Sequence, residues 1–125
     1  MKNKIPFNFF GEEQEICFTI GGVREFERTL GKTIGQILLS QYDGVDFVLT
    51  ALPIALKRIQ PLLYEEKIEK YLTEDYGRSI NDIAFPVLYA LFLSGAAGKT
   101  WQDVAIARYF PEALKPVEDE QAKNE

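Results

Sequence analysis

The chain has 125 residues, of which 46% are hydrophobic and 26% charged, a size and composition that predict one folded domain. Its formal net charge of -5 argues against a nucleic-acid partner, because phosphate contacts need clustered Lys and Arg. The chain contains no histidine, which removes the commonest general base and metal ligand, so we expect a non-enzymatic protein without a catalytic, cofactor or metal site.

Two segments near the N-terminus alternate between hydrophobic and other residues. Every second position is hydrophobic in residues 5–9 and again in residues 16–20, which is the period of a strand with one buried face. A polar segment beginning at Gly11 separates them, as in a hairpin turn. The sequence therefore predicts an N-terminal β-hairpin over about residues 5–20, packed against a helix.

The next segment has the period of an amphipathic helix. Hydrophobic residues recur at steps of three and four over residues 23–38, so we expect this face, including Leu30, in the core. Gly31 is expected to close a first helix, since glycine accepts the left-handed backbone of a helix cap. Thr33 and Gln36 form a capping-box pattern that starts a second helix, and one continuous helix is the alternative.

A strongly apolar helix is expected at residues 45–60. Asp43 and Asp46 are spaced to cap its start, and Pro61 is expected to end it. Pro53 lies on its narrow polar stripe, which predicts a kink rather than a break, because the freed carbonyl can reach water. We expect this helix to be the most deeply buried one.

Two further helices are expected before residue 98. Residues 64–72 carry hydrophobic side chains at helical spacing on one side of a charged segment, which predicts an ordinary surface helix. Ser79 and Asp82 then form a capping-box pattern ahead of the apolar run at residues 83–98. This run and the one at residues 45–56 are shorter than the roughly 18 to 20 residues that span a bilayer.

A last, short helix is expected between Thr100 and Pro111, with Thr100 and Asp103 as its capping pair. Residues 116–125 are polar and mostly charged, and we expect them to form a disordered acidic tail. The predicted fold is therefore mainly α: a single domain over residues 1–115, with about five helices and the N-terminal hairpin.

Two motifs near residue 100 suggest other functions. The segment Gly95–Thr100 resembles the end of a phosphate-binding P-loop, but Leu93 stands where the first glycine is required and the preceding run looks helical. Residues 100–105 could instead open a helix of a helix-turn-helix, with Arg108 reaching DNA. A small DNA-binding or regulatory adaptor is therefore the alternative function.

A partner-binding surface is expected on the apolar run after Ser79. If the fully apolar side of that helix packs into the core, Tyr89 and Leu93 form an exposed patch with Trp101 and Tyr109. Such patches usually mark protein interfaces. The alternatives are that the helix is buried on all sides, or that the patch closes a homo-oligomer.

Residues 15–34 resemble the opening of the tail assembly chaperones of long-tailed bacteriophages. In that family a strand leads into a helix with a pattern like Arg-x-Leu-Glu-x-x-Leu-Gly. The matching positions are Arg24, Phe26, Glu27, Leu30 and Gly31, and Phe26 stands where the family often has Leu. The order of the apolar and amphipathic helices extends the resemblance over residues 5–98.

The resemblance implies a chaperone of the host bacterial cytoplasm that is needed during tail assembly and is absent from the mature virion. Its implied client is the tape measure protein, around which the tail tube protein is recruited. Such chaperones shield apolar helical segments from aggregation, which requires an apolar groove or face rather than catalytic groups. The expected partners are thus proteins, with no nucleic acid and no membrane.

Overall fold

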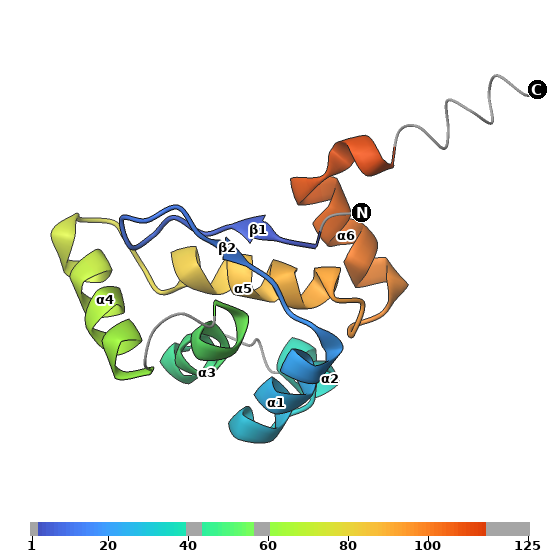
Figure 1. Cartoon of the computed structure of the whole chain (residues 1–125), viewed down its shortest axis with the longest axis horizontal. Coiled ribbons are helices and arrows are strands. Elements are labelled where there is room, and N and C mark those ends of the chain that lie inside the picture. Colours follow the sequence, from blue (N-terminus) through green and yellow to red (C-terminus); the bar gives the residue numbers. More distant parts are fainter. Residues whose placement is uncertain (1–2, 40–43, 57–60, 115–125) are drawn as a thin grey trace, which may run out of the picture.

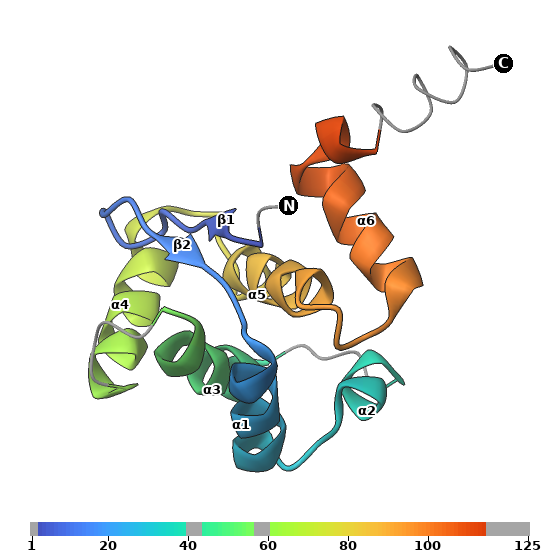
Figure 2. The same cartoon turned by 45° about the vertical axis from the view of Figure 1, so that its right-hand side comes forward.

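The computed structural model describes residues 3–39, 44–56 and 61–114. Within them, six α-helices follow an N-terminal two-stranded sheet (Figures 1 and 2), so the predicted mainly helical fold is confirmed. The tail predicted at residues 116–125 lies outside the described residues. The elements are β1 (Ile5–Pro6), β2 (Glu15–Ile16), α1 (Ile20–Leu30), α2 (Ile34–Leu39), α3 (Val45–Ala55), α4 (Pro61–Glu74), α5 (Asn81–Leu93), α6 (Lys99–Tyr109) and a 3-10 turn, η1 (Pro111–Ala113).

Helix α5 lies at the centre of the fold. The hairpin runs along one side of it and α3 lies on the other, while α4 stands near its start and α6 near its end (Figures 1 and 2). Nine of its 13 residues are buried, against six of 11 in α3. The expectation that residues 45–60 form the most buried helix is therefore wrong, because the hairpin, α3 and α6 all pack against α5. No helix of the described residues is long and apolar enough to cross a membrane.

The N-terminal hairpin has the predicted alternation. Its strands pair antiparallel with Ile5 opposite Ile16, and the Phe7 N–H donates to the Gln14 carbonyl at 2.8 Å. The side chains that alternate inward and are buried are those of Ile5, Phe7, Ile16 and Phe18. Ile20, the last residue of the second predicted run, is instead 64% exposed and begins α1. The strand period ends there because the Thr19 hydroxyl caps the helix, accepting from the Gly22 N–H at 2.9 Å.

The break between α1 and α2 is as predicted. Gly31 has a left-handed backbone, with φ of 77°, and its N–H donates to the Glu27 carbonyl at 2.9 Å. Both halves of the capping box are formed: the Thr33 N–H donates to the Gln36 side-chain carbonyl at 2.9 Å, and the Gln36 N–H donates to the Thr33 hydroxyl at 3.1 Å. Two helices therefore replace the continuous helix that was the alternative.

Two predicted helix boundaries need correction. Pro61 begins α4, a position that suits proline because the first turn of a helix has no partner for its N–H. The predicted cap Asp43 and the predicted last turn of the preceding helix, residues 57–60, lie outside the described residues. Thr100 is not the cap of α6, because the helix already begins at Lys99, which follows Gly98 with φ of 97°.

Candidate protein-binding groove

A groove with a volume of about 550 Å³ lies between β1, α5 and α6. It is bounded by the start of the hairpin, by one side of α5 and by the last turn of α6. Most of its lining is aromatic or proline, with one acidic and one basic side chain. The lining residues are Pro6, Phe9, Asp82, Phe85, Pro86, Tyr89, Arg108 and Tyr109.

The floor of the groove is the one side of α5 that the other helices leave open. Asp82, Phe85 and Tyr89 occupy it at steps of three and four, the spacing of one helical face. Phe85 is 45% exposed and Tyr89 is half-buried, whereas the residues on the other sides of α5 are buried. This face therefore offers apolar surface to a partner without opening the core.

The wall on the α6 side is held by contacts between aromatic rings. The rings of Tyr89 and Tyr109 meet edge to face with centroids 5.5 Å apart, and Tyr89 also meets Phe92 at 5.9 Å. Burial raises the pKa of the Tyr109 hydroxyl, although the neighbouring Arg108 guanidinium acts in the opposite direction. Tyr109 therefore remains a neutral phenol at physiological pH, with an apolar ring and a polar tip.

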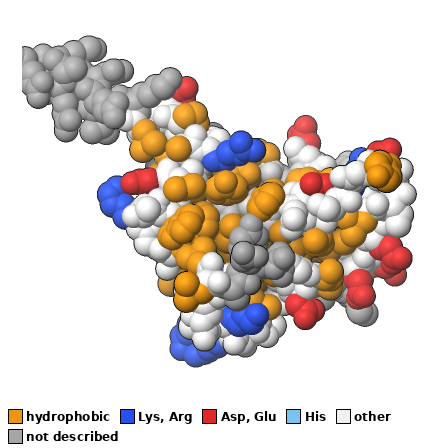
Figure 3. All heavy atoms as spheres, turned by 180° about the vertical axis from the view of Figure 1, so that it is seen from behind, with side chains coloured by type: hydrophobic (Ala, Val, Ile, Leu, Met, Phe, Trp, Pro, Cys, Tyr) orange, Lys and Arg blue, Asp and Glu red, His pale blue; other side chains and the backbone are white. Residues whose placement is uncertain are grey.

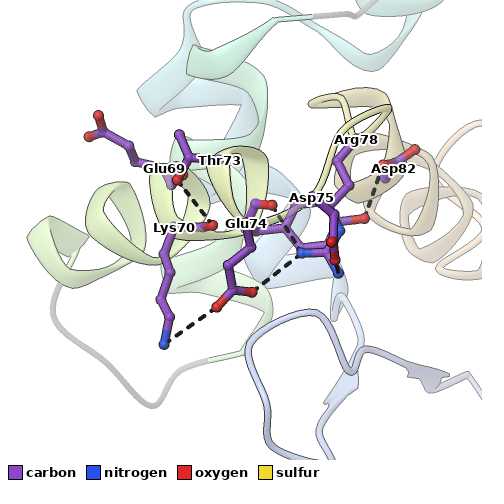
Figure 4. A network of polar contacts seen from close by, with 8 residues as sticks. Glu69, Lys70, Thr73, Glu74, Asp75, Arg78 and Asp82 are labelled. Atoms are coloured by element: carbon purple, nitrogen blue, oxygen red, sulfur yellow. Dashed lines mark hydrogen bonds and ion pairs between the residues drawn. The ribbon is translucent and has the colours of Figure 1, made fainter.

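Asp82 is fixed at the start of α5 by the turn that joins it to α4 (Figure 4). Its carboxylate accepts from the Tyr71 hydroxyl at 3.0 Å and from the Ser79 N–H at 3.1 Å. The second bond is half of the predicted capping box. The Arg78 guanidinium lies 4.3 Å from the centroid of the Tyr71 ring and donates to the Tyr71 carbonyl at 3.0 Å. Asp82 is thus held in place by neutral donors.

The surroundings of Tyr71, on α4, raise the pKa of its hydroxyl. Burial raises the pKa of its hydroxyl most, and the hydrogen bond to Asp82 and the charge of that carboxylate raise it further, against the opposing charge of Arg78. A neutral hydroxyl can keep donating to Asp82. The geometry at this end of the groove therefore depends on a protonated Tyr71.

The structure brings together two of the four residues that were predicted to bind a partner. Tyr89 and Tyr109 lie together in the groove. Trp101 is 41% exposed, but it stacks on Phe92 with centroids 4.9 Å apart and does not line the groove.

The expected exposure of Leu93 is wrong, since its side chain is only 2% exposed. Helix α6 packs across this end of α5, and the Gln102 side-chain amide donates to the Leu93 carbonyl at 3.5 Å. The alternative reading, a helix buried on all sides, describes this end of α5. A charge at Leu93 would be buried, so a substitution there tests folding rather than partner binding.

Sequence reasoning did not single out Phe85 as a lining residue. A signal for it was present, because Phe85 lies three residues after Asp82 and four before Tyr89 on the same helical face. Pro6 and Phe9 carried no such signal, since only the tertiary fold brings the hairpin against α5.

The residues that carry the family resemblance lie elsewhere, at the junction of α1 and α2. Phe26 is buried, and its ring meets the rings of one core residue just after β2 and one on α3, whereas Arg24 is exposed. The Glu27 carboxylate accepts from the Ile34 N–H at 2.8 Å. Leu30 is only half-buried, which corrects the expectation of a full core position. These residues shape the helix junction, and none of them lines the groove.

Hydrophobic side chains also gather on the face of the molecule that Figure 3 shows. There they lie across the middle of the face, and charged side chains stand mainly around its margin. In the described residues, the large exposed hydrophobic side chains outside the groove are those of Ile20, Leu39, Val45, Leu63, Tyr76, Trp101, Val104 and Leu114.

Two other kinds of site, for a metal ion and for phosphate, concern the described residues. No group of three or more His, Cys, Asp or Glu side chains there could hold a metal ion. The segment Gly95–Thr100 follows helix α5, whereas a P-loop follows a strand.

No protein-family model, curated protein or solved structure matches this chain.

Proposed function

We propose that the chain is a phage tail assembly chaperone that binds an apolar helical segment of the tape measure protein in the groove between β1, α5 and α6. Such a complex would form in the host cytoplasm, with the tail tube protein joining it during assembly. The client helix would lay its apolar stripe on the aromatic lining, which removes that stripe from water. The net charge of -5 opposes association between copies of the chaperone.

The half-exposed ring of Phe85 is the observation that carries this proposal. Phe85 lies on the most buried helix of the fold and is nevertheless 45% exposed, in the floor of the groove. A partner that covered this ring would gain apolar burial, which contributes about 25 cal/mol per Å². Aromatic side chains in such pockets are the usual anchors of protein interfaces.

The DNA-binding alternative depends on the basic residues of α6. That helix has two of them, Lys99 and Arg108, and Lys99 forms an ion pair with Asp103 at 3.1 Å. A phosphate-binding face needs several clustered cations. The composition of α6 therefore favours a protein partner over DNA.

Co-expression with the tape measure protein of the same phage tests the proposal. We expect the chain to keep the tape measure protein in the supernatant and to remain bound to it when NaCl is raised from about 0.1 M to about 0.5 M, because salt does not weaken apolar burial. A tape measure protein that stays insoluble would contradict the proposal. Binding to duplex DNA that weakens steeply over the same salt range would favour the alternative.

A further inference from the structure

The two charged residues of the groove lie at opposite ends of its apolar floor. Asp82 is in the first turn of α5, and Tyr89 lies about 10 Å further along that helix, at 1.5 Å per residue. Arg108 follows on from the Tyr89 end, since it precedes Tyr109, whose ring meets that of Tyr89. Figure 1 agrees: α6 stands near the end of α5, and α5 starts on the side of α4. The groove is therefore negative at one end and positive at the other.

Neither charge is neutralised by an opposite charge in the described residues, although Arg108 lies beside the Tyr109 hydroxyl. The ion pairs of the described residues involve neither Asp82 nor Arg108, whereas Arg78, Lys70 and Lys99 each have a carboxylate within 4.0 Å. Asp82 accepts two hydrogen bonds, both from neutral donors, and a carboxylate can accept about four. Arg108 is exposed, and a guanidinium offers several donors in a planar fork.

From this arrangement, and resting on the proposed function of the groove, we infer that the groove selects client helices by charge. The preferred segment has an apolar stripe of about two turns with an acidic residue at one end and a basic residue at the other. The acidic residue pairs with Arg108 and the basic residue with Asp82. A segment with two like charges places one of them against a groove residue of the same sign, and this repulsion disfavours binding.

Four synthetic peptides of about 18 residues, long enough to extend beyond both ends of the groove, test this inference. They share one leucine stripe and carry Glu and Lys, Lys and Glu, two Glu or two Lys at its ends. Their termini are acetylated and amidated to remove other charges. The dissociation constant of each is measured by fluorescence anisotropy at low salt. We expect the two bipolar peptides to bind about two- to fivefold more tightly than the others, the range for a single pair at a surface.

The Arg108→Glu variant makes both ends of the groove negative, so it should reverse the preference and bind the peptide with two Lys most tightly. Arg24→Glu is the matched control, because it makes the same change of net charge at an exposed position of α1, outside the groove. It should keep the wild-type order of the peptides. The same order in both variants, or wild-type preference for two Lys, would overturn the inference.

The Phe85→Glu variant separates this inference from the proposed function. If it abolishes binding of all four peptides while the wild type binds them regardless of charge, the groove binds helices and only charge selection is wrong. If peptide binding is unchanged in Phe85→Glu, the groove is not the binding site, and the proposed site fails together with the inference.

Discussion

Phe26 joins three parts of the chain through one side chain. It is 0% exposed, and its ring lies 5.8 Å from that of Phe18 beside β2 and 5.5 Å from that of Phe47 on α3. We expect Phe26→Ala to lower the free energy of unfolding by about 3 to 5 kcal/mol, because it empties a closed site. Leu30→Ala, at a half-buried position of the same helix, should cost about 1 to 2 kcal/mol. Urea melts measure both, and equal losses would show that burial does not distinguish these positions.

Tyr71 should make stability sensitive to alkaline pH. Its pKa in the folded chain is raised, mainly by burial and then by Asp82, whereas in the unfolded chain it lies near its usual value of about 10. The contribution of Tyr71 to the stability of the fold is therefore fully present below about pH 10 and is lost as pH rises through the folded-state pKa. Urea melts at increasing pH should show a shallower alkaline loss for Tyr71→Phe than for the wild type. Tyr76→Phe, at a fully exposed position, should behave as the wild type, and a similar slope in all three would contradict the assignment.

At the scale of elements, the junction of α1 and α2 depends on backbone conformation. Gly31 has φ of 77°, and a Cβ built there would meet nothing within 4 Å. We therefore expect Gly31→Ala to lower the free energy of unfolding by about 1 kcal/mol, through backbone strain alone. Gly35→Ala is the control, since Gly35 lies inside α2 and outside the left-handed region, and alanine there should stabilise by about 0.4 to 1 kcal/mol. Thermal melts that shift in the same direction for both variants would rule out this explanation of the junction.

The elements that could be predicted from the sequence are those whose signals are local. The Gly31 cap and the Thr33 capping box depend on neighbours a few residues away, and both are formed. Leu93 was misplaced for the opposite reason. Helix α5 is apolar around most of its circumference, so its own pattern cannot tell which side another element will cover. The packing of α6 decides that Leu93 is buried and leaves Phe85 half-exposed.

The groove combines segments that are far apart in the sequence. Pro6 and Phe9 come from the hairpin, Phe85 from α5 and Tyr109 from the end of α6. Two of its aromatic residues were predicted from the sequence: Tyr89 in the apolar run after Ser79, and Tyr109 on the short helix that follows that run. The contribution of the hairpin to the groove could not be predicted, since no local pattern predicts which helix face a strand will lie beside.

One pair of variants tests whether the tape measure protein binds at Phe85. Phe85→Glu places a charge in the groove, and Tyr76→Glu makes the same kind of change at a fully exposed aromatic residue outside it. Circular dichroism should show both variants folded. The measurement is the soluble fraction of co-expressed tape measure protein. We predict that it falls to the level without chaperone for Phe85→Glu and stays at the wild-type level for Tyr76→Glu. Full solubility with a folded Phe85→Glu variant would contradict the assignment of the groove.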